Sequence, residues 1–188
     1  FCEIICNVIT KSTNQDLLKT ATATVGEYLF YVATQEETPE NKDWHIQNKY
    51  LTTLLFCLEL QQNDQTKFYA VKTIENIAIL TEVSKGYFAS NDSFIIKVID
   101  IYKTTKNNDL KQSAINLCAH LIKHNTTLLK VFLNQIPIFK DTTIFTNENA
   151  TIQQSLLNCL LFFCVKNTTG LELILPQCGN LIEVLVND

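Results

Sequence analysis

The chain of 188 residues contains no methionine, no arginine, only four glycines and only three prolines. So few helix-breaking residues predict long helices, and few segments show the strict polar–apolar alternation of β-strands. All fifteen basic residues are lysines, so the rigid guanidinium fork that recognises base edges and phosphates is missing. Together with a formal net charge of −4, this composition argues against nucleic acid as the main ligand.

Long apolar runs and a leader are missing as well. The longest apolar run, Cys159 to Val165, has seven residues, whereas a membrane span requires about 20. No signal peptide is visible, and Phe1 already lies in an apolar helical pattern, so we expect a piece of a longer protein and no membrane partner. The seven cysteines lack the spacing of a disulfide framework and predict reduced core residues of an intracellular protein.

Motifs for catalysis are also lacking. No phosphate-binding loop, nucleophile elbow or kinase signature is present. His120 and His124 are one helical turn apart, as in some zinc sites, but Leu121 stands where the metalloprotease pattern requires glutamate, and no third ligand has suitable spacing. The sequence therefore predicts no catalytic residue, no cofactor and no metal site in this segment.

What the chain does contain is a helical face that recurs. In Tyr69–Ala78, small or apolar residues at positions 70, 73, 74, 77 and 78 fall on one side of a helix. Degenerate copies of this face begin at Ala21, Ala114 and Leu156, so that the four copies, in chain order, are 49, 44 and 42 residues apart. A polar insertion at 38–43 accounts for the long first step. Helical repeats of roughly 40–47 residues are typical of armadillo and HEAT solenoids.

We therefore predict an all-α fold, a right-handed armadillo/HEAT-like helical solenoid of about four repeats that forms a single domain over residues 1–188. Each unit consists of a shorter helix, a polar turn and a longer helix, and its apolar face can be covered only by its neighbours. The expected repeats span residues 1–36, 44–84, 92–124 and 127–166, with a partial unit at 169–188.

Local signals predict several helix boundaries. Ser12 and Thr151, each followed three residues later by glutamine, fit capping boxes at the starts of two long helices. A helix expected over 65–84 is followed by Gly86, which suits the positive-φ position just past a helix C-terminus. Trp44, the only tryptophan, follows a polar loop and is expected to fill the core.

The armadillo pattern also suggests where a partner would bind. In family members that grip extended peptides, an asparagine on the longer helix holds the peptide backbone, and a tryptophan one turn earlier packs on its side chains. In each of the four copies, the residues at the tryptophan position and at the asparagine position are, in that order, Ala23 and Glu27, Lys72 and Asn76, Asn116 and His120, and Asn158 and Phe162. Only the second copy has an asparagine, Asn76, at the asparagine position, and no copy has a tryptophan at the earlier position. The peptide groove of nuclear-import receptors is therefore not favoured. The candidate partner-binding residues are Glu27, Lys72, Asn76, Asn116, His120, Asn158 and Phe162.

Three phrases together resemble one family more closely. They are Gly26–Glu36, Trp44 with the apolar helix that follows it, and Tyr69–Ile77. They are similar to the armadillo-repeat region behind the kinase-like domain in the family of the fourth Unc-51-like kinase, a pseudokinase, and plant Runkel, with the Fused kinase as a more distant relative. The resemblance is dense over 16–80 and thin beyond about residue 125. It implies a kinase-like domain elsewhere in the protein, active or inactive, and a scaffold linked to microtubules of cilia, flagella or the dividing cell.

The sequence thus predicts a non-catalytic scaffold that binds other proteins, which the resemblance suggests are ciliary or microtubule-associated, in the cytoplasm or cytoskeleton. A peptide- or cargo-binding adaptor of the transport-receptor type is an alternative, but Glu27 and Phe162 interrupt the polar ladder that it needs. A helical lobe of an enzyme is another, and it requires a pocket that gathers several perturbed titratable groups. Direct binding of lysines to the acidic tails of tubulin would need a local basic stripe on a chain of net charge −4.

Overall fold

The computed structural model describes residues 2–36, 46–59, 63–90, 92–166, 175–179 and 182. Within these ranges every regular element is a helix and no strand occurs, which confirms the all-α prediction. Trp44 and the polar loop at 38–43 lie outside the described residues, so the expected burial of the tryptophan stays a prediction.

Shorter and longer helices alternate along the described chain. The shorter helices are α1 (Cys2–Lys11), α3 (Asn48–Glu59), α6 (Asp92–Thr104) and α8 (Leu128–Gln135). The longer helices are α2 (Gln15–Glu36), α4 (Asp64–Leu80), α7 (Asn108–His124) and α10 (Ala150–Lys166). Small additional elements are α5 (Glu82–Ala89), α9 (Thr143–Thr146) and the 3-10 turn η1 (Leu175–Gln177).

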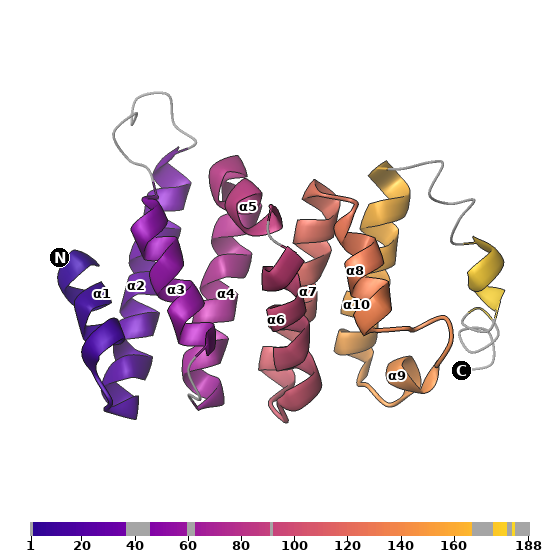
Figure 1. Ribbon diagram of the computed structural model, residues 1–188, viewed down its shortest axis with the longest axis horizontal. Coiled ribbons are helices and arrows are strands. Elements are labelled where there is room, and N and C mark those ends of the chain that lie inside the picture. Colours follow the sequence, from indigo (N-terminus) through magenta and orange to yellow (C-terminus); the bar gives the residue numbers. More distant parts are fainter. Residues whose placement is uncertain are drawn as a thin grey trace.

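The long helices pack on one another in chain order, α2 against α4, α4 against α7, and α7 against α10. The shorter helices α1, α3 and α6 each pack on the long helix that follows them, whereas α8 packs mainly on α6. In Figure 1 the helices stand side by side along the longest axis of the molecule, from α1 at one end to α10 towards the other. The result is a row in which each helix contacts its near neighbours in the sequence.

An asparagine caps the N-terminus of every long helix. The side-chain oxygens of Asn14, Asn63, Asn107 and Asn149 accept a hydrogen bond from the backbone N–H three residues later, at 3.0, 3.0, 3.1 and 3.1 Å. Each bond satisfies one of the amide groups that the first helical turn leaves without a partner, and such a cap stabilises a helix by about 1 kcal/mol. These four asparagines are 49, 44 and 42 residues apart, the same steps that separate the apolar faces.

The prediction that Ser12 and Thr151 cap α2 and α10 is therefore wrong, because Asn14 and Asn149 cap these helices. Ser12 accepts a hydrogen bond from the N–H of Asn14 at 3.1 Å, and Thr151 donates to Asn149 Oδ1 at 2.6 Å. Both hydroxyls thus support the capping asparagine instead of capping the helix themselves. The asparagine side chain reaches the third amide directly, so the neighbouring hydroxyl is left to orient it.

The helix expected over 65–84 is two helices. α4 ends at Leu80, and Thr81 adopts an extended conformation with φ −123° and ψ 133°. The hydroxyl of Thr81 accepts a hydrogen bond from Ser84 N–H at 3.2 Å, which starts α5 immediately. Gly86 lies inside α5, and the described glycines have no positive φ, so the prediction that it ends a helix is wrong.

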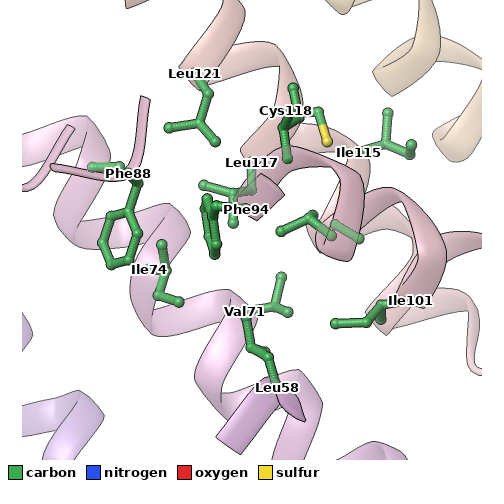
Figure 2. Packing of buried hydrophobic residues seen from close by; sticks show 14 of the residues in the cluster. Leu58, Val71, Ile74, Phe88, Phe94, Ile101, Ile115, Leu117, Cys118 and Leu121 are labelled. Carbon is green, nitrogen blue, oxygen red and sulfur yellow. The ribbon is translucent and has the colours of Figure 1, made fainter. Parts of the chain in front are cut away.

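The recurring apolar face forms the core. Ala70, Ile74, Ile77 and Ala78 are fully buried, as are the corresponding residues of the copy that begins at Ala114. Figure 2 shows side chains of α3 to α7 meeting in one of these layers, where Phe88 packs on Phe94 with ring centroids 4.8 Å apart. Complete burial of a large apolar side chain contributes about 1.5–3 kcal/mol, so these layers account for the association of the helices.

Helices α2 and α4 are in close contact at Gly26. A Cβ atom on Gly26 would overlap the hydroxyl oxygen of Thr73, so the glycine makes room for the side chain of the neighbouring helix. This is a close-approach use of glycine, because its φ is not positive.

Candidate partner-binding surface

The structure places the seven predicted partner-binding residues on the four long helices. Glu27 is exposed on α2, and the six on α4, α7 and α10 are half-buried. Because the apolar face of each long helix is buried against its neighbours, these residues occupy the side that remains accessible. We call this accessible side of α2, α4, α7 and α10 the long-helix face. Its role in binding stays a prediction, but its members do lie on successive, mutually packed helices.

Three of its side chains meet across α7 and α10. The rings of His120 and Phe162 are tilted by 38° with centroids 5.9 Å apart. Lys123 places its ammonium 5.2 Å from the centre of the Phe162 ring, within the range of a cation–π contact. Phe162 of α10 therefore contacts both an imidazole and an ammonium group of α7.

Lys72 has a structural partner on its own helix. Its Nζ lies 2.9 Å from Oε2 of Glu75, whose side chain is only 6% exposed, whereas the lysine side chain is 43% exposed. A buried carboxylate needs a nearby positive charge, because its desolvation is costly. Lys72 thus neutralises Glu75 and still presents part of its side chain to solvent.

Three lysines lie near enough to His120 to affect its protonation. Burial lowers the pKa of His120 below its ordinary value of 6.5, and the charges of Lys123, Lys85 and Lys72 lower it further. These lysines come from α7, α5 and α4, so helix packing brings together charges that are far apart in sequence.

The sequence reasoning missed four exposed apolar side chains on the same helices. Phe30 and Tyr31 on α2 are 41% and 54% exposed, Ile79 on α4 is 48% exposed, and Leu161 on α10 is 53% exposed. They follow Glu27, Asn76 or Asn158 by three or four residues and therefore share their side of the helix. The available signal was an apolar residue outside the buried helical stripe, which marks a surface that another molecule can cover.

Away from this face, Glu148 anchors the segment that follows α9. Its Oε1 accepts hydrogen bonds from Lys111 Nζ at 2.8 Å and from the Tyr102 hydroxyl at 3.0 Å. Burial raises the pKa of Tyr102, and the Glu148 carboxylate raises it further. These groups border a hollow of about 300 Å³, but the carboxylate is occupied by its two donors and acts as a structural tie.

The described residues contain no metal-binding cluster and no helix that could cross a membrane. No group of three or more histidine, cysteine, aspartate or glutamate side chains in this part of the chain is arranged to hold a metal ion. None of the helices in the described ranges combines the length and the apolar character that crossing a bilayer demands.

Five described cysteines, at positions 2, 6, 57, 118 and 159, are free thiols, and all of them except Cys6 are buried. Burial raises the pKa of Cys57, Cys118 and Cys159, so these thiols stay protonated in the core. Cys6 differs, because the hydrogen bond from the Cys2 thiol lowers its pKa to about 6. The side chain of Cys164 lies outside the described residues.

Comparison with known proteins adds one relative. No family model matches the chain, and no solved structure matches it. The chain is 28% identical over 152 residues to serine/threonine-protein kinase RUNKEL of Arabidopsis thaliana, an alignment that covers 73% of this chain but only 11% of that protein. The chain is therefore similar to a small part of a much longer kinase, and the similarity supports a kinase-related origin.

Proposed function

We propose that this chain is a non-catalytic scaffold, an armadillo-like right-handed solenoid of about four repeats that binds partner proteins on its long-helix face. The repeats would have the boundaries predicted from the sequence. The observation that carries this proposal is the agreement between two independent series. The apolar faces and the capping asparagines recur with the same steps of 49, 44 and 42 residues.

The chemistry of the surface supports binding to proteins. Among the eight large apolar side chains that are exposed in the described residues, five belong to long helices: Leu17, Phe30, Tyr31, Ile79 and Leu161. The shorter helices α3, α6 and α8 contribute none of these eight. Aromatic and aliphatic side chains interspersed with amides and charges are the composition expected of a protein interface.

The cellular role in this proposal comes from similarity to other proteins. The chain would be the armadillo region of a kinase-like or pseudokinase protein associated with microtubules of cilia or flagella. The similarity to a part of RUNKEL and the resemblance of the Gly26–Glu36 and Tyr69–Ile77 phrases support this assignment. Proximity labelling from the full-length protein in ciliated cells tests it, and labelling without enrichment of microtubule-associated proteins would contradict it.

Site-specific photo-crosslinking in the full-length protein tests the binding face. Benzoylphenylalanine placed at Asn76, Asn116 or Asn158 should capture partner proteins, because these half-buried positions lie on the long-helix face. The same probe at the exposed positions Asp100 on α6 and Asn134 on α8 is the matched control. Equal capture at both sets of positions, or capture at the control positions alone, would contradict the assignment of the face.

A transport-receptor type of peptide adaptor is the second candidate. It is favoured by Asn76, which is accessible on α4 as the peptide-gripping pattern requires. The corresponding positions of α7 and α10 hold His120 and Phe162, whose rings pack on each other and leave no amide to hold a peptide backbone. Loss of partner capture on substitution of Asn76 alone, with no effect of changes at Leu161 or Tyr31, would favour this candidate.

A further inference from the structure

Two thiols lie one turn apart on α1. Cys2 and Cys6 are four residues apart and share the side of the helix on which Ile9 is fully buried against the neighbouring helices α2 and α3. Cys2 is only 4% exposed, whereas Cys6 is half-buried and therefore partly accessible. We propose that this pair is a reversible redox site, in which hydrogen peroxide oxidises Cys6 and Cys2 then closes a disulfide within α1. Such a modification is independent of the proposed scaffold function.

Cys6 has the properties of the thiol that reacts first. Attack on a peroxide requires a thiolate that the oxidant can reach, and redox-sensitive cysteines often have a second cysteine beside them. The hydrogen bond from the Cys2 thiol lowers the pKa of Cys6 to about 6, so most Cys6 side chains are ionised at pH 7. The same hydrogen bond raises the pKa of Cys2, which therefore keeps its proton. The two thiols thus differ both in charge and in exposure.

The charged groups near the pair oppose each other. Lys49 of α3 is ion-paired with Glu3 of α1, with Nζ 3.5 Å from Oε1. The lysine lowers the pKa of Cys6 and the glutamate raises it, so neither charge decides the state of the thiol by itself. Cys2 therefore has two roles, because it stabilises the Cys6 thiolate and is placed to react with the oxidised form of Cys6.

The oxidation proceeds in two balanced steps. The Cys6 thiolate attacks one oxygen of hydrogen peroxide and the O–O bond breaks, so Cys6 becomes a sulfenic acid and the other oxygen leaves as hydroxide, which takes up a proton to form water. The Cys2 sulfur then attacks the Cys6 sulfur and the S–O bond breaks, so the hydroxyl leaves as a second water with the proton of the Cys2 thiol. The two thiols have then given two electrons to the peroxide and share a disulfide bond.

Helix geometry couples this disulfide to the shape of α1. Residues four apart on a helix have Cβ atoms about 5–6 Å apart, whereas a disulfide requires a Cβ separation of about 3.5–4.5 Å. The turn between Cys2 and Cys6 must therefore distort by about 1–2 Å before the bond can form. A disulfide closed under such strain is readily reduced, so the modification is reversible.

Peptide mass mapping of the full chain tests the pairing. Trypsin cleaves after Lys11, so one peptide contains both Cys2 and Cys6. After brief treatment with hydrogen peroxide at pH 7 and alkylation of the remaining thiols, this peptide should have lost two hydrogen atoms and should carry no alkyl group, and dithiothreitol should restore both thiols. The peptide with the fully buried Cys118 is the control and should stay reduced over the same time. Unreacted Cys2 and Cys6, or a disulfide from Cys6 to Cys57, would overturn the proposal.

Serine substitutions separate the roles of the two thiols. In Cys2→Ser the hydroxyl can still donate a hydrogen bond to Cys6 but cannot form a disulfide, so the sulfenic acid at Cys6 should accumulate and react with dimedone. In Cys6→Ser the remaining thiol is buried and protonated, and its oxidation should be at least about tenfold slower. Cys57→Ser is the matched control at a buried thiol of α3 and should leave the disulfide unchanged. Faster oxidation of Cys2 than of Cys6 in the single variants, or as much dimedone adduct in the wild type as in Cys2→Ser, would contradict the assigned roles.

Amide hydrogen exchange tests the distortion of the helix. Exchange in α1 should be faster in the oxidised chain than in the reduced chain and should slow again after dithiothreitol, whereas exchange in α7 should not change. Peroxide-treated Cys2→Ser controls for other effects of the oxidant, because it forms no disulfide within α1. Equal exchange of α1 in the oxidised and the reduced chain would show that the disulfide does not act on the helix and would overturn the coupling.

Discussion

Gly26 offers a sharp test of the packing between α2 and α4. A Cβ atom at this position would overlap the hydroxyl oxygen of Thr73 and would lie 3.5 Å from its Cβ atom. Gly86 is the matched control, because it also lies inside a helix and its added Cβ would come no closer than 3.9 Å to His124 Nε2. Both changes to alanine gain the same helix propensity, and only one of them meets an obstacle.

The magnitudes follow from two opposing effects. Replacing a helical glycine with alanine stabilises by about 1 kcal/mol, and forcing extra volume into a packed interface costs about 1–3 kcal/mol. Gly86→Ala should therefore raise the free energy of unfolding by about 1 kcal/mol. Gly26→Ala should lower it by up to about 2 kcal/mol, so the two variants should differ by about 1–3 kcal/mol.

Urea unfolding followed by circular dichroism at 222 nm measures both variants, and a double-mutant cycle identifies the cause. In a Thr73→Ala background the obstructing hydroxyl is gone, so Gly26→Ala should become stabilising by about 1 kcal/mol. The coupling energy between positions 26 and 73 should then be about 2 kcal/mol. Equal stabilisation by both glycine substitutions, or a coupling energy below about 0.5 kcal/mol, would refute the close approach of these helices.

Three further predictions concern titratable and reactive groups. The pKa of His120 lies below its ordinary value of 6.5 in the folded chain, so protonation destabilises the fold. The unfolding free energy of the wild type relative to His120→Gln should therefore be constant above about pH 6.5 and should fall as the pH drops below that value. Urea titrations of both proteins at pH 7 and pH 5 measure this difference, and the same difference at the two pH values would contradict the prediction. Glu148→Gln should lower the free energy of unfolding by about 1–3 kcal/mol, because Lys111 loses a charged partner at a largely buried position. The control Glu59→Gln removes the exposed partner of Lys97 and should lower the free energy of unfolding by less than about 1 kcal/mol. Equal losses in the two variants would argue against Glu148 as a structural tie. Iodoacetamide at pH 7 should modify Cys6 before any other described cysteine, because its pKa is lowered to about 6 and its side chain is partly accessible. The buried Cys118, whose pKa is raised, should react only in urea. Peptide mass mapping over time gives the order of modification, and early labelling of Cys118 would be inconsistent with its burial.

The helices and their buried faces could be predicted from the sequence because they depend on local periodicity. The spacing of Ala70, Ile74 and Ile77 places all three on one side of a helix whatever their neighbours are, and the structure buries all three. The break at Thr81 could not be predicted, because threonine is tolerated within a helix. In the structure its hydroxyl accepts a hydrogen bond from the backbone N–H of Ser84 and thereby starts a new helix. It also assigned the caps to hydroxyl residues, although the asparagines at equivalent positions were available as a series.

The candidate surface could be predicted only in outline. Helical spacing places Asn76 and His120 on accessible sides of their helices, and the structure agrees with that placement. Lys85 comes near His120 because α5 packs against both α4 and α7, whereas the sequence predicts one continuous helix over 65–84 and no separate α5. Whether Ile79 is covered likewise depends on which helix packs beside it, and the residue pattern of a single helix gives no information on its neighbours.

The row of helices has a mechanical consequence. Since α2, α4, α7 and α10 touch in series and α1 and α10 lie far apart in the row, a force that separates these helices would load every interface equally. Interfaces in series add their extensions, and each can open while the others remain closed. Pulled from both ends, this row would lengthen in discrete steps as successive interfaces open, and it would shorten again when the tension is released.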